Sequence, residues 1–271
     1  MDTPAPAPAA PRGRATVAGM VFTFAHYTFR EMVSNRLLVL IVLFAVLGLG
    51  LASFLAEVAI TEHEQVQLAL IAALYRFCAV FLMMIFVVSS IVREFNDKCL
   101  ELYLAMPVSR AIYFAGKVCG FILCGFVLAA VFAAVMLLYA DWRSLVLWCL
   151  SLTAELAMVA VFAFFAVLTF NQQITASVFI TFFFYMLSRL TDTIQLISEA
   201  PILAETLGNN IIEFMLWILR AVLPRLSNYT QTDWLVYGGG WEQLPLILAS
   251  SVVYSGLISA MAMWDFMRKN I

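Results

Sequence analysis

Charged residues are scarce in this chain of 271 residues, and their scarcity excludes most classes of soluble protein. Asp, Glu, Lys and Arg make up 12% of the sequence, hydrophobic residues make up 64%, and the mean hydropathy is +0.98. A soluble domain is about 25% charged and about 45–50% apolar. No soluble core of this length could bury so much apolar surface, which excludes a secreted disulfide scaffold, a disordered chain and a nucleic-acid-binding protein. The composition predicts an all-α integral membrane protein in a lipid bilayer.

Histidines and nucleotide-binding motifs are also few. His26 and His63 fall on opposite sides of the predicted membrane, so they cannot join in a metal site or a catalytic triad. A phosphate-binding loop needs glycine, four further residues and then Gly-Lys-Ser/Thr. The only Gly-Lys pair, Gly116-Lys117, lacks both the first glycine and the hydroxyl residue. We therefore expect no metal, no catalytic residue and no cofactor on this chain, and any ATP must be hydrolysed elsewhere.

Long hydrophobic runs, by contrast, are abundant. A bilayer core about 30 Å thick needs about 20 helical residues. A run at residues 174–187 reaches that length only by continuing past Arg189 and Asp192 at the headgroup level. Five other runs reach it unaided: residues 37–55, 68–92, 118–140, 145–170 and 244–264. The sequence thus predicts six transmembrane helices in one domain, residues 17–271, after a disordered Pro/Ala-rich tail at residues 1–16.

Lysine and arginine are distributed unevenly between the connections, and this predicts the orientation of the chain. Cytoplasmic segments of membrane proteins carry an excess of these residues. The outer side has Arg143, Arg189, Arg220 and Arg225. The N-terminal segment, the second loop and the C-terminus together have Arg12, Arg14, Arg30, Arg36, Arg93, Lys98, Arg110, Lys117, Arg268 and Lys269. Both termini should be cytoplasmic, and the net charge of −2 hides a basic inner face and an acidic outer face.

The long cytoplasmic connection, residues 93–117, has the pattern of a short amphipathic helix. Leu100, Tyr103 and Leu104 share one helical face, charged residues occupy another, and Pro107 ends the helix. Such a helix, lying flat under the membrane, suits the docking of another protein. A solvated connector explains the pattern equally well, and the residues alone do not choose between the two.

Short motifs in this connection point to a known family. They are Arg93-Glu94, Glu101-Leu102-Tyr103-Leu104, Pro107-Val108-Ser109-Arg110 and Gly116-Lys117. In this order they resemble the ABC-2 type permeases, the membrane subunits of one class of ATP-binding-cassette transporters, although Lys98-Cys99 replaces the Gly-Thr of many members. Phe29-Arg30-Glu31 and Asn35-Arg36 look like the N-terminal interfacial helix of this family. Three later segments are similar to the C-terminal third of the six-span, NosY-like subgroup: Leu223-Pro224, Tyr237-Gly238 and Asp265-Phe266-Met267-Arg268-Lys269.

The resemblance implies a permease subunit of an exporter in the cell (inner) membrane. Two permeases, as a homodimer or a pair with a related chain, would each dock one ABC ATPase subunit that holds ATP and Mg²⁺. Closure of the ATPases would tilt the spans between inward and outward states and move an unidentified substrate out. The implied docking residues are Arg93, Glu94, Asp97, Glu101, Pro107 and Arg110 in a coupling helix, and Arg30, Glu31 and Arg36 belong to an N-terminal interfacial helix.

The outer segment between the last two spans, residues 188–243, contains another short apolar run. Residues 211–223 would extend about 20 Å, too short to cross the bilayer. Glu213 and Arg220 lie on one face of this run and Pro224 ends it. We expect a re-entrant or interfacial helix, which resembling permeases place over the exit. A seventh span is disfavoured because it would bury several polar residues and move the basic C-terminus outside.

Two charges fall inside predicted spans. Arg76 and Glu155 each lie about 13–16 Å from the outer end of their spans. An isolated charge at that depth is costly, so matched depths predict a pair. A structural pin between two helices is favoured over a pathway or switch role. Close helix packing, within the subunit or at a dimer seam, is predicted for the small-residue stripe of Gly116, Gly120 and Cys124.

Two other functions compete with the exporter. An ATP-independent membrane assembly or scaffold factor would use the same cytoplasmic loop to dock a partner that is not an ATPase. An intramembrane enzyme is disfavoured, because the spans hold one carboxylate and no histidine and so offer no acid–base pair.

Overall fold

A computed structural model of the chain describes residues 17–35, 37–58, 63–97, 109–198, 214, 217–218 and 223–268. Every regular element in that part of the chain is helical. The elements are α1 (Val17–Ser34), α2 (Leu37–Val58), α3 (His63–Asn96), α5 (Arg110–Met136), α6 (Trp142–Thr169), α7 (Ile174–Ser198), the short 3-10 helix η1 (Leu226–Asn228), α9 (Asp233–Val236) and α10 (Leu244–Arg268). The predicted disordered tail lies outside the described residues.

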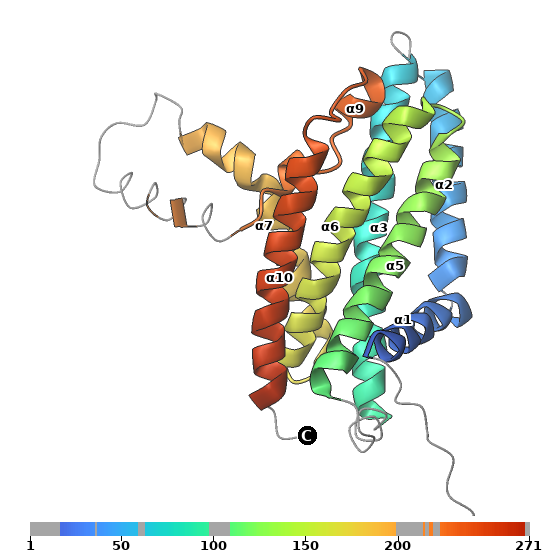
Figure 1. Cartoon of the computed structure of the whole chain (residues 1–271). Helices are drawn as coiled ribbons and strands as arrows, with labels where there is room; N and C mark the ends of the chain where they lie inside the picture. Colours follow the sequence, from blue (N-terminus) through green and yellow to red (C-terminus); the bar gives the residue numbers. More distant parts are fainter. Residues whose placement is uncertain are drawn as a thin grey trace, which may run out of the picture.

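Five helices run side by side as a bundle: α2, α3, α5, α6 and α10 (Figure 1). Each of the five is long and apolar enough to cross a membrane. The prediction of a helical multi-pass membrane protein is thereby confirmed. The remaining candidate, α7, has a shorter apolar part, Ile174–Leu190, so a sixth span stays a prediction.

The bundle is built around α6. Of the residues in its apolar stretch, 78% are buried, whereas the corresponding fraction is 28% in α2 and 22% in α10. The two outer helices expose large apolar side chains, among them Val46 on α2 and Val252 on α10. Such faces are unfavourable in water and stable against lipid or another subunit.

Helix α1 crosses the bundle obliquely at one end and packs on α5 (Figure 1). Two glycines of α5 allow this close approach, because a Cβ atom on Gly116 would lie 2.5 Å from Phe24 Cβ and one on Gly120 would lie 2.7 Å from Thr28 Cβ. Cys124, the third member of the small-residue stripe, has its Sγ 4.0 Å from the Thr28 carbonyl oxygen. The stripe therefore forms a seam within the subunit, between α5 and the N-terminal helix.

Changing Gly116 to Ala is expected to destabilise the protein by about 1–3 kcal/mol, because the new methyl group would overlap Phe24 and lie 3.1 Å from the Val21 carbonyl oxygen. Gly50→Ala is the matched control, since a Cβ atom there meets nothing within 4 Å, and it should be neutral or slightly stabilising. The free energy of unfolding in bicelles, measured by steric trapping, checks both. Equal stability of the two variants would contradict the close packing of α1 on α5.

The connection between the second and third predicted spans is shorter than the sequence predicts. Helix α3 continues to Asn96, and α5 begins at Arg110, where the Ser109 hydroxyl caps it by accepting the Ile112 N–H at 3.3 Å. Gly116 and Lys117, placed in the loop by the sequence, therefore belong to α5. Glu94 near the end of α3 and Lys117 in the second turn of α5 are paired inside the bundle, so these charges do not end the helices. The predicted amphipathic helix around residues 100–107 lies outside the described residues.

The two ends of the bundle differ. The start of α5, the end of α10 and all of α1 lie at one end, which we call the α1 end (Figure 1). At the opposite end, residues 223–232, which include η1, lead into α9. We call this segment the strap, and this end the strap end. Most of the predicted re-entrant run at residues 211–223 lies outside the described residues, including Glu213 and Arg220.

Candidate functional site

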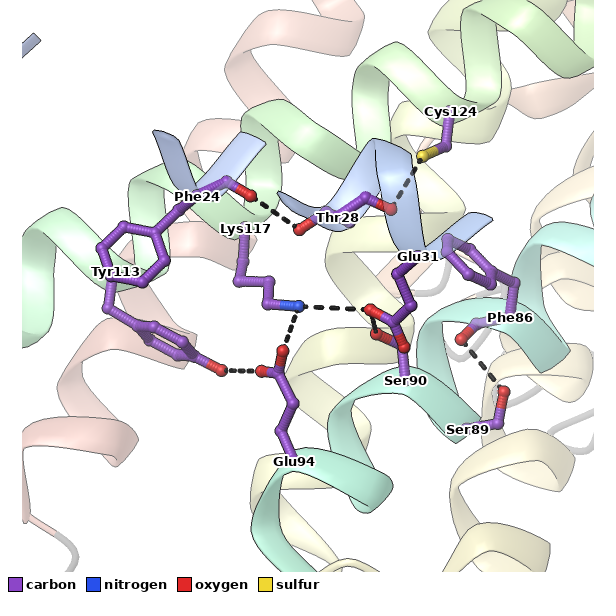
Figure 2. Close-up of polar contacts among 10 residues, drawn as sticks. All are labelled: Phe24, Thr28, Glu31, Phe86, Ser89, Ser90, Glu94, Tyr113, Lys117 and Cys124. Carbon is purple, nitrogen blue, oxygen red and sulfur yellow. Dashed lines mark hydrogen bonds and ion pairs between the residues drawn. The ribbon is translucent and has the colours of Figure 1, made fainter. Parts of the chain in front are cut away.

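Three helices bring a lysine and two glutamates together at the α1 end. Lys117 of α5 is fully buried, and its Nζ lies 2.5 Å from Glu94 Oε1 of α3 and 3.6 Å from Glu31 Oε2 of α1 (Figure 2). The Ser90 hydroxyl donates to Glu31 at 2.7 Å, and the Tyr113 hydroxyl donates to Glu94 at 2.5 Å. We call these five residues the α1-end cluster.

The α1-end cluster joins the N-terminal helix to the two helices that flank the undescribed residues 98–108. Its lysine is also surrounded by aromatic faces, with Nζ 5.9 Å from the ring centroid of Tyr27 and 5.7 Å from that of Phe121. A cation over an aromatic ring is stabilised by the negative face of the ring. The buried lysine thus has favourable partners on α1, α3 and α5, and a displacement of any one of these helices would separate charges in a water-poor site.

The structure divides two sets of predicted residues into exposed and inward-facing ones: the docking residues Arg93, Glu94 and Asp97, and the interfacial-helix residues Arg30 and Glu31. Arg30, Arg93 and Asp97 are exposed at the α1 end. Glu94 and Glu31, in contrast, point at Lys117 inside the bundle, so their carboxylates face the protein interior (Figure 2).

Arg110 forms a different link at the same end. It donates through Nη1 to the Phe266 carbonyl oxygen at 3.0 Å and lies 5.8 Å from the centroid of that ring, which joins α5 to α10. Three further predicted residues, Arg36, Glu101 and Pro107, lie outside the described residues.

The predicted intramembrane charges belong to a second cluster, at the strap end. Arg76 of α3 donates through Nη1 to the Thr230 carbonyl oxygen at 3.0 Å. Arg189 of α7 donates through Nη1 to the carbonyl oxygens of Leu226 at 2.5 Å and Tyr229 at 2.8 Å. Both guanidinium groups therefore hold backbone oxygens of the strap.

Glu155 of α6 completes this strap-end cluster. Its fully buried carboxylate accepts a hydrogen bond from the Thr230 hydroxyl and lies 3.6 Å from Arg189 Nη1. The ion pair that the structure gives Glu155 is thus with Arg189, and Arg76 reaches the same cluster through Thr230. The Ser151 hydroxyl accepts the Thr230 N–H at 2.9 Å.

The strap-end cluster provides hydrogen-bond partners for buried backbone groups of the strap. Thr230 is fully buried and has a φ of 47°, a left-handed conformation that is uncommon for residues other than glycine. Its N–H and C=O groups cannot form helical hydrogen bonds there, and buried backbone groups need partners. Ser151 of α6 accepts the N–H and Arg76 of α3 donates to the C=O, while Arg189 of α7 holds other carbonyl oxygens of the strap. The cluster therefore pins the strap across three helices, and it extends the structural role expected for Arg76 and Glu155.

Two cavities accompany the clusters. The first, of about 470 Å³, is an almost wholly apolar groove between α3 and α7, with Phe81, Met84, Val178 and Phe182 among its lining residues. The second, of about 330 Å³, lies between the strap and α10 and has polar and apolar walls. Pro224, predicted as the end of the outer helix, is buried and lines this second cavity.

Sequence reasoning missed three residues of these clusters. The sequence places Lys117 at the end of the cytoplasmic connection and Arg189 at the headgroup level, and it gives no signal for Thr230. For Lys117 the sequence does contain a signal of helix membership: it follows Tyr113 by one helical turn at the start of an apolar run. The partners of all three are distant in sequence, so only the tertiary fold identifies them.

Comparison with known proteins does not assign the chain to a family: no protein-family model matches it, and no curated protein matches it. The features of the chain that bear on its function are therefore the two clusters, the helical bundle with its apolar faces and the sequence motifs.

Proposed function

We propose that the chain is the membrane-spanning permease subunit of an ATP-binding-cassette exporter of the ABC-2 type, powered by a separate ATPase subunit that docks at residues 93–110. The observation that carries this proposal is the α1-end cluster. Lys117 connects the interfacial helix α1 to the ends of α3 and α5, which lead into the proposed docking loop. A push on that loop would therefore move three helices together.

A rigid joint at this position suits the conversion of ATPase closure into helix tilting. Gly116 and Gly120 let α1 lie directly on α5, and the buried ion pairs resist separation of the helices. Arg93 and Asp97 remain exposed beside the joint and offer charges to a partner. Because association through exposed charges depends on complementary potentials, reversal of one charge should weaken docking without unfolding the bundle.

The same proposal includes six spans, with α7 as the fifth in chain order. Arg189 interrupts the apolar stretch of α7, but the helix continues to Ser198. Because Glu155 forms an ion pair with Arg189 and strap carbonyl groups accept its N–H groups, its charge has partners inside the protein. Cytoplasmic termini would place the α1 end and its docking loop inside the cell and the strap outside. The outward apolar faces of α2 and α10 would contact lipid or a second permease, in a homodimer or with a related chain.

The test is purification of the tagged full-length chain from its native membrane into nanodiscs. The proposal predicts that an ATP-hydrolysing protein with a phosphate-binding loop is retained, and that Arg93→Glu lowers the retained ATPase activity by about tenfold or more. Arg143→Glu is the matched control, because Arg143 is an exposed arginine at the opposite end of the bundle and lies on Trp142. It should leave the activity unchanged.

Two results would contradict the proposal. Retention of a partner without ATPase activity, with the same dependence on Arg93, would favour the ATP-independent scaffold instead. An equal loss of ATPase activity in both charge-reversal variants would show that residues 93–110 are not the docking surface.

A further inference from the structure

The cavity between the strap and α10 has the chemistry of a ligand site. It is about 330 Å³ in volume, which falls within the range of small-molecule pockets. Arg225, Asn228, Tyr229, Ser250 and Tyr254 are the polar residues that line it. None of the described residues that line it is acidic. The Tyr229 and Ser250 hydroxyls are engaged with each other and with the Ile247 carbonyl oxygen, so Arg225 and Asn228 are the side chains with donors for a ligand.

Arg225 is the charged group of this cavity. It is exposed, and it makes no ion pair with any residue that the structure describes. Arg189 donates to the Tyr229 carbonyl oxygen at 2.8 Å, but its charge is paired with Glu155 at 3.6 Å, so Arg225 is the charged group of the lining that a ligand would meet. An arginine at the mouth of such a pocket favours a phosphate or carboxylate group, because the guanidinium presents paired N–H donors.

The inner wall of the cavity is already fixed in shape. The Tyr229 hydroxyl lies 3.0 Å from the Ile247 carbonyl oxygen and 2.7 Å from Ser250 Oγ, which links the strap to α10. Burial raises the pKa of Tyr229 above its ordinary value, so this hydroxyl stays protonated and neutral at physiological pH. A ligand would therefore meet a wall that needs little rearrangement, which favours binding.

The position of the cavity indicates an amphipathic ligand. Its α10 wall extends from Leu246 to Tyr254, about 12 Å along the helix axis from the strap end. Leu246 is 71% exposed on the apolar outer face of α10. The α10 wall of the cavity therefore adjoins the outward apolar face, which would contact lipid or a second permease, and Arg225 and Asn228 belong to the strap wall.

We propose that this cavity binds the phosphate group of an anionic lipid. Arg225 and Asn228 contact the phosphate, and Leu246 and Ile247 contact the adjoining acyl region. The proposal goes beyond the exporter function and does not depend on it, because binding requires neither ATP nor an ATPase partner.

Native mass spectrometry of the purified full-length chain in maltoside micelles tests the site. The probes are phosphatidic acid and phosphatidylcholine with identical acyl chains. We expect the first molecule of phosphatidic acid to bind at least about tenfold more tightly, since one charge-assisted contact accounts for a difference of that size. Arg225→Gln should abolish the preference and Asn228→Ala should reduce it. Arg143→Gln, which removes an exposed arginine elsewhere, should keep it.

Equal affinity for the two lipids in the wild-type chain would overturn the proposal, and so would an unchanged preference in Arg225→Gln. Inorganic phosphate separates the two sources of the phosphate group. A lipid site retains phosphatidic acid in a hundredfold molar excess of inorganic phosphate. A site for soluble phosphate releases the lipid under that condition, which would overturn the assignment to a lipid. Because Arg225 is exposed, its substitution is not expected to unfold the chain.

Discussion

Lys117→Met is expected to lower the free energy of unfolding by about 3–5 kcal/mol, the typical effect of removing one partner from a buried ion pair. The side chain of Lys117 is fully buried, and its loss would leave the carboxylates of Glu31 and Glu94 facing each other with only the Ser90 and Tyr113 hydroxyls as donors. Steric trapping in bicelles, or the thermal midpoint in the same lipid, measures the change.

Two controls separate this electrostatic effect from simple loss of a cation. Arg93→Met removes an exposed cation from the same end of α3 and should change stability by no more than about 1 kcal/mol. The triple variant Lys117→Met, Glu31→Gln, Glu94→Gln removes all three charges and should recover most of the lost stability, because neutral replacements of a buried ion cluster are often tolerated. A single Lys117→Met variant as stable as the wild type would contradict the role of the α1-end cluster.

Glu155→Gln is expected to release the strap. The amide can still accept from the Thr230 hydroxyl, but it removes the ion-pair partner that the structure gives Arg189 and the negative charge of the cluster that also contains Arg76. Breaking such a buried pair by removing its anion is strongly unfavourable, so the strap should open more often. The reaction rate of a membrane-impermeant maleimide with Leu226→Cys should rise at least about tenfold, because Leu226 is fully buried in the closed strap.

In the maleimide experiment, other accessible cysteines must not react with the reagent. Cys119 is exposed and Cys99 lies outside the described residues, so both are changed to Ser in every variant. Thr153→Val is the matched control on α6, since the Thr153 hydroxyl donates only within its own helix, to Cys149. It should leave the rate at position 226 unchanged. An unaltered rate in Glu155→Gln would show that the strap is held by its other contacts alone.

The spans were predictable because apolar runs of membrane length have few structural alternatives. The ends of those spans were less predictable, and the reason is visible at Lys117. A charged residue at the edge of an apolar run suggests the end of a helix, and yet α5 begins at Arg110, seven residues earlier. Partners on α1 and α3 neutralise the lysine, and no local pattern shows that these helices would meet it.

The predicted pairing of Arg76 with Glu155 agrees with the structure in one respect only. Both residues belong to the same cluster, but the ion pair of Glu155 is with Arg189. Equal distances from the outer ends of two spans placed both residues near the same level, and the structure puts both into the strap-end cluster. The direct partner of Glu155 is Arg189 because the strap folds back between the helices and occupies Arg76 with a carbonyl oxygen. The course of such a connection cannot be read from residue spacing.

The two clusters have complementary positions. The α1-end cluster joins helices that lead into the proposed docking loop, and the strap-end cluster holds the strap through Arg76, further toward the start of the same helix α3. A tilt of α3 driven from the docking loop would move Arg76 relative to Glu155. Under the proposed function, the strap is therefore the part of the outer face that should respond to ATP.

The most direct measurement of ATP-driven coupling is the maleimide reaction rate of Leu226→Cys in proteoliposomes that contain the permease and its ATPase subunit. The exporter mechanism predicts that the rate rises when Mg²⁺ and ATP reach the docking-loop side. It predicts no rise with the permease alone, and a smaller rise in the Lys117→Met variant. A rate that is the same with and without ATP in the complete wild-type assembly would contradict the mechanism.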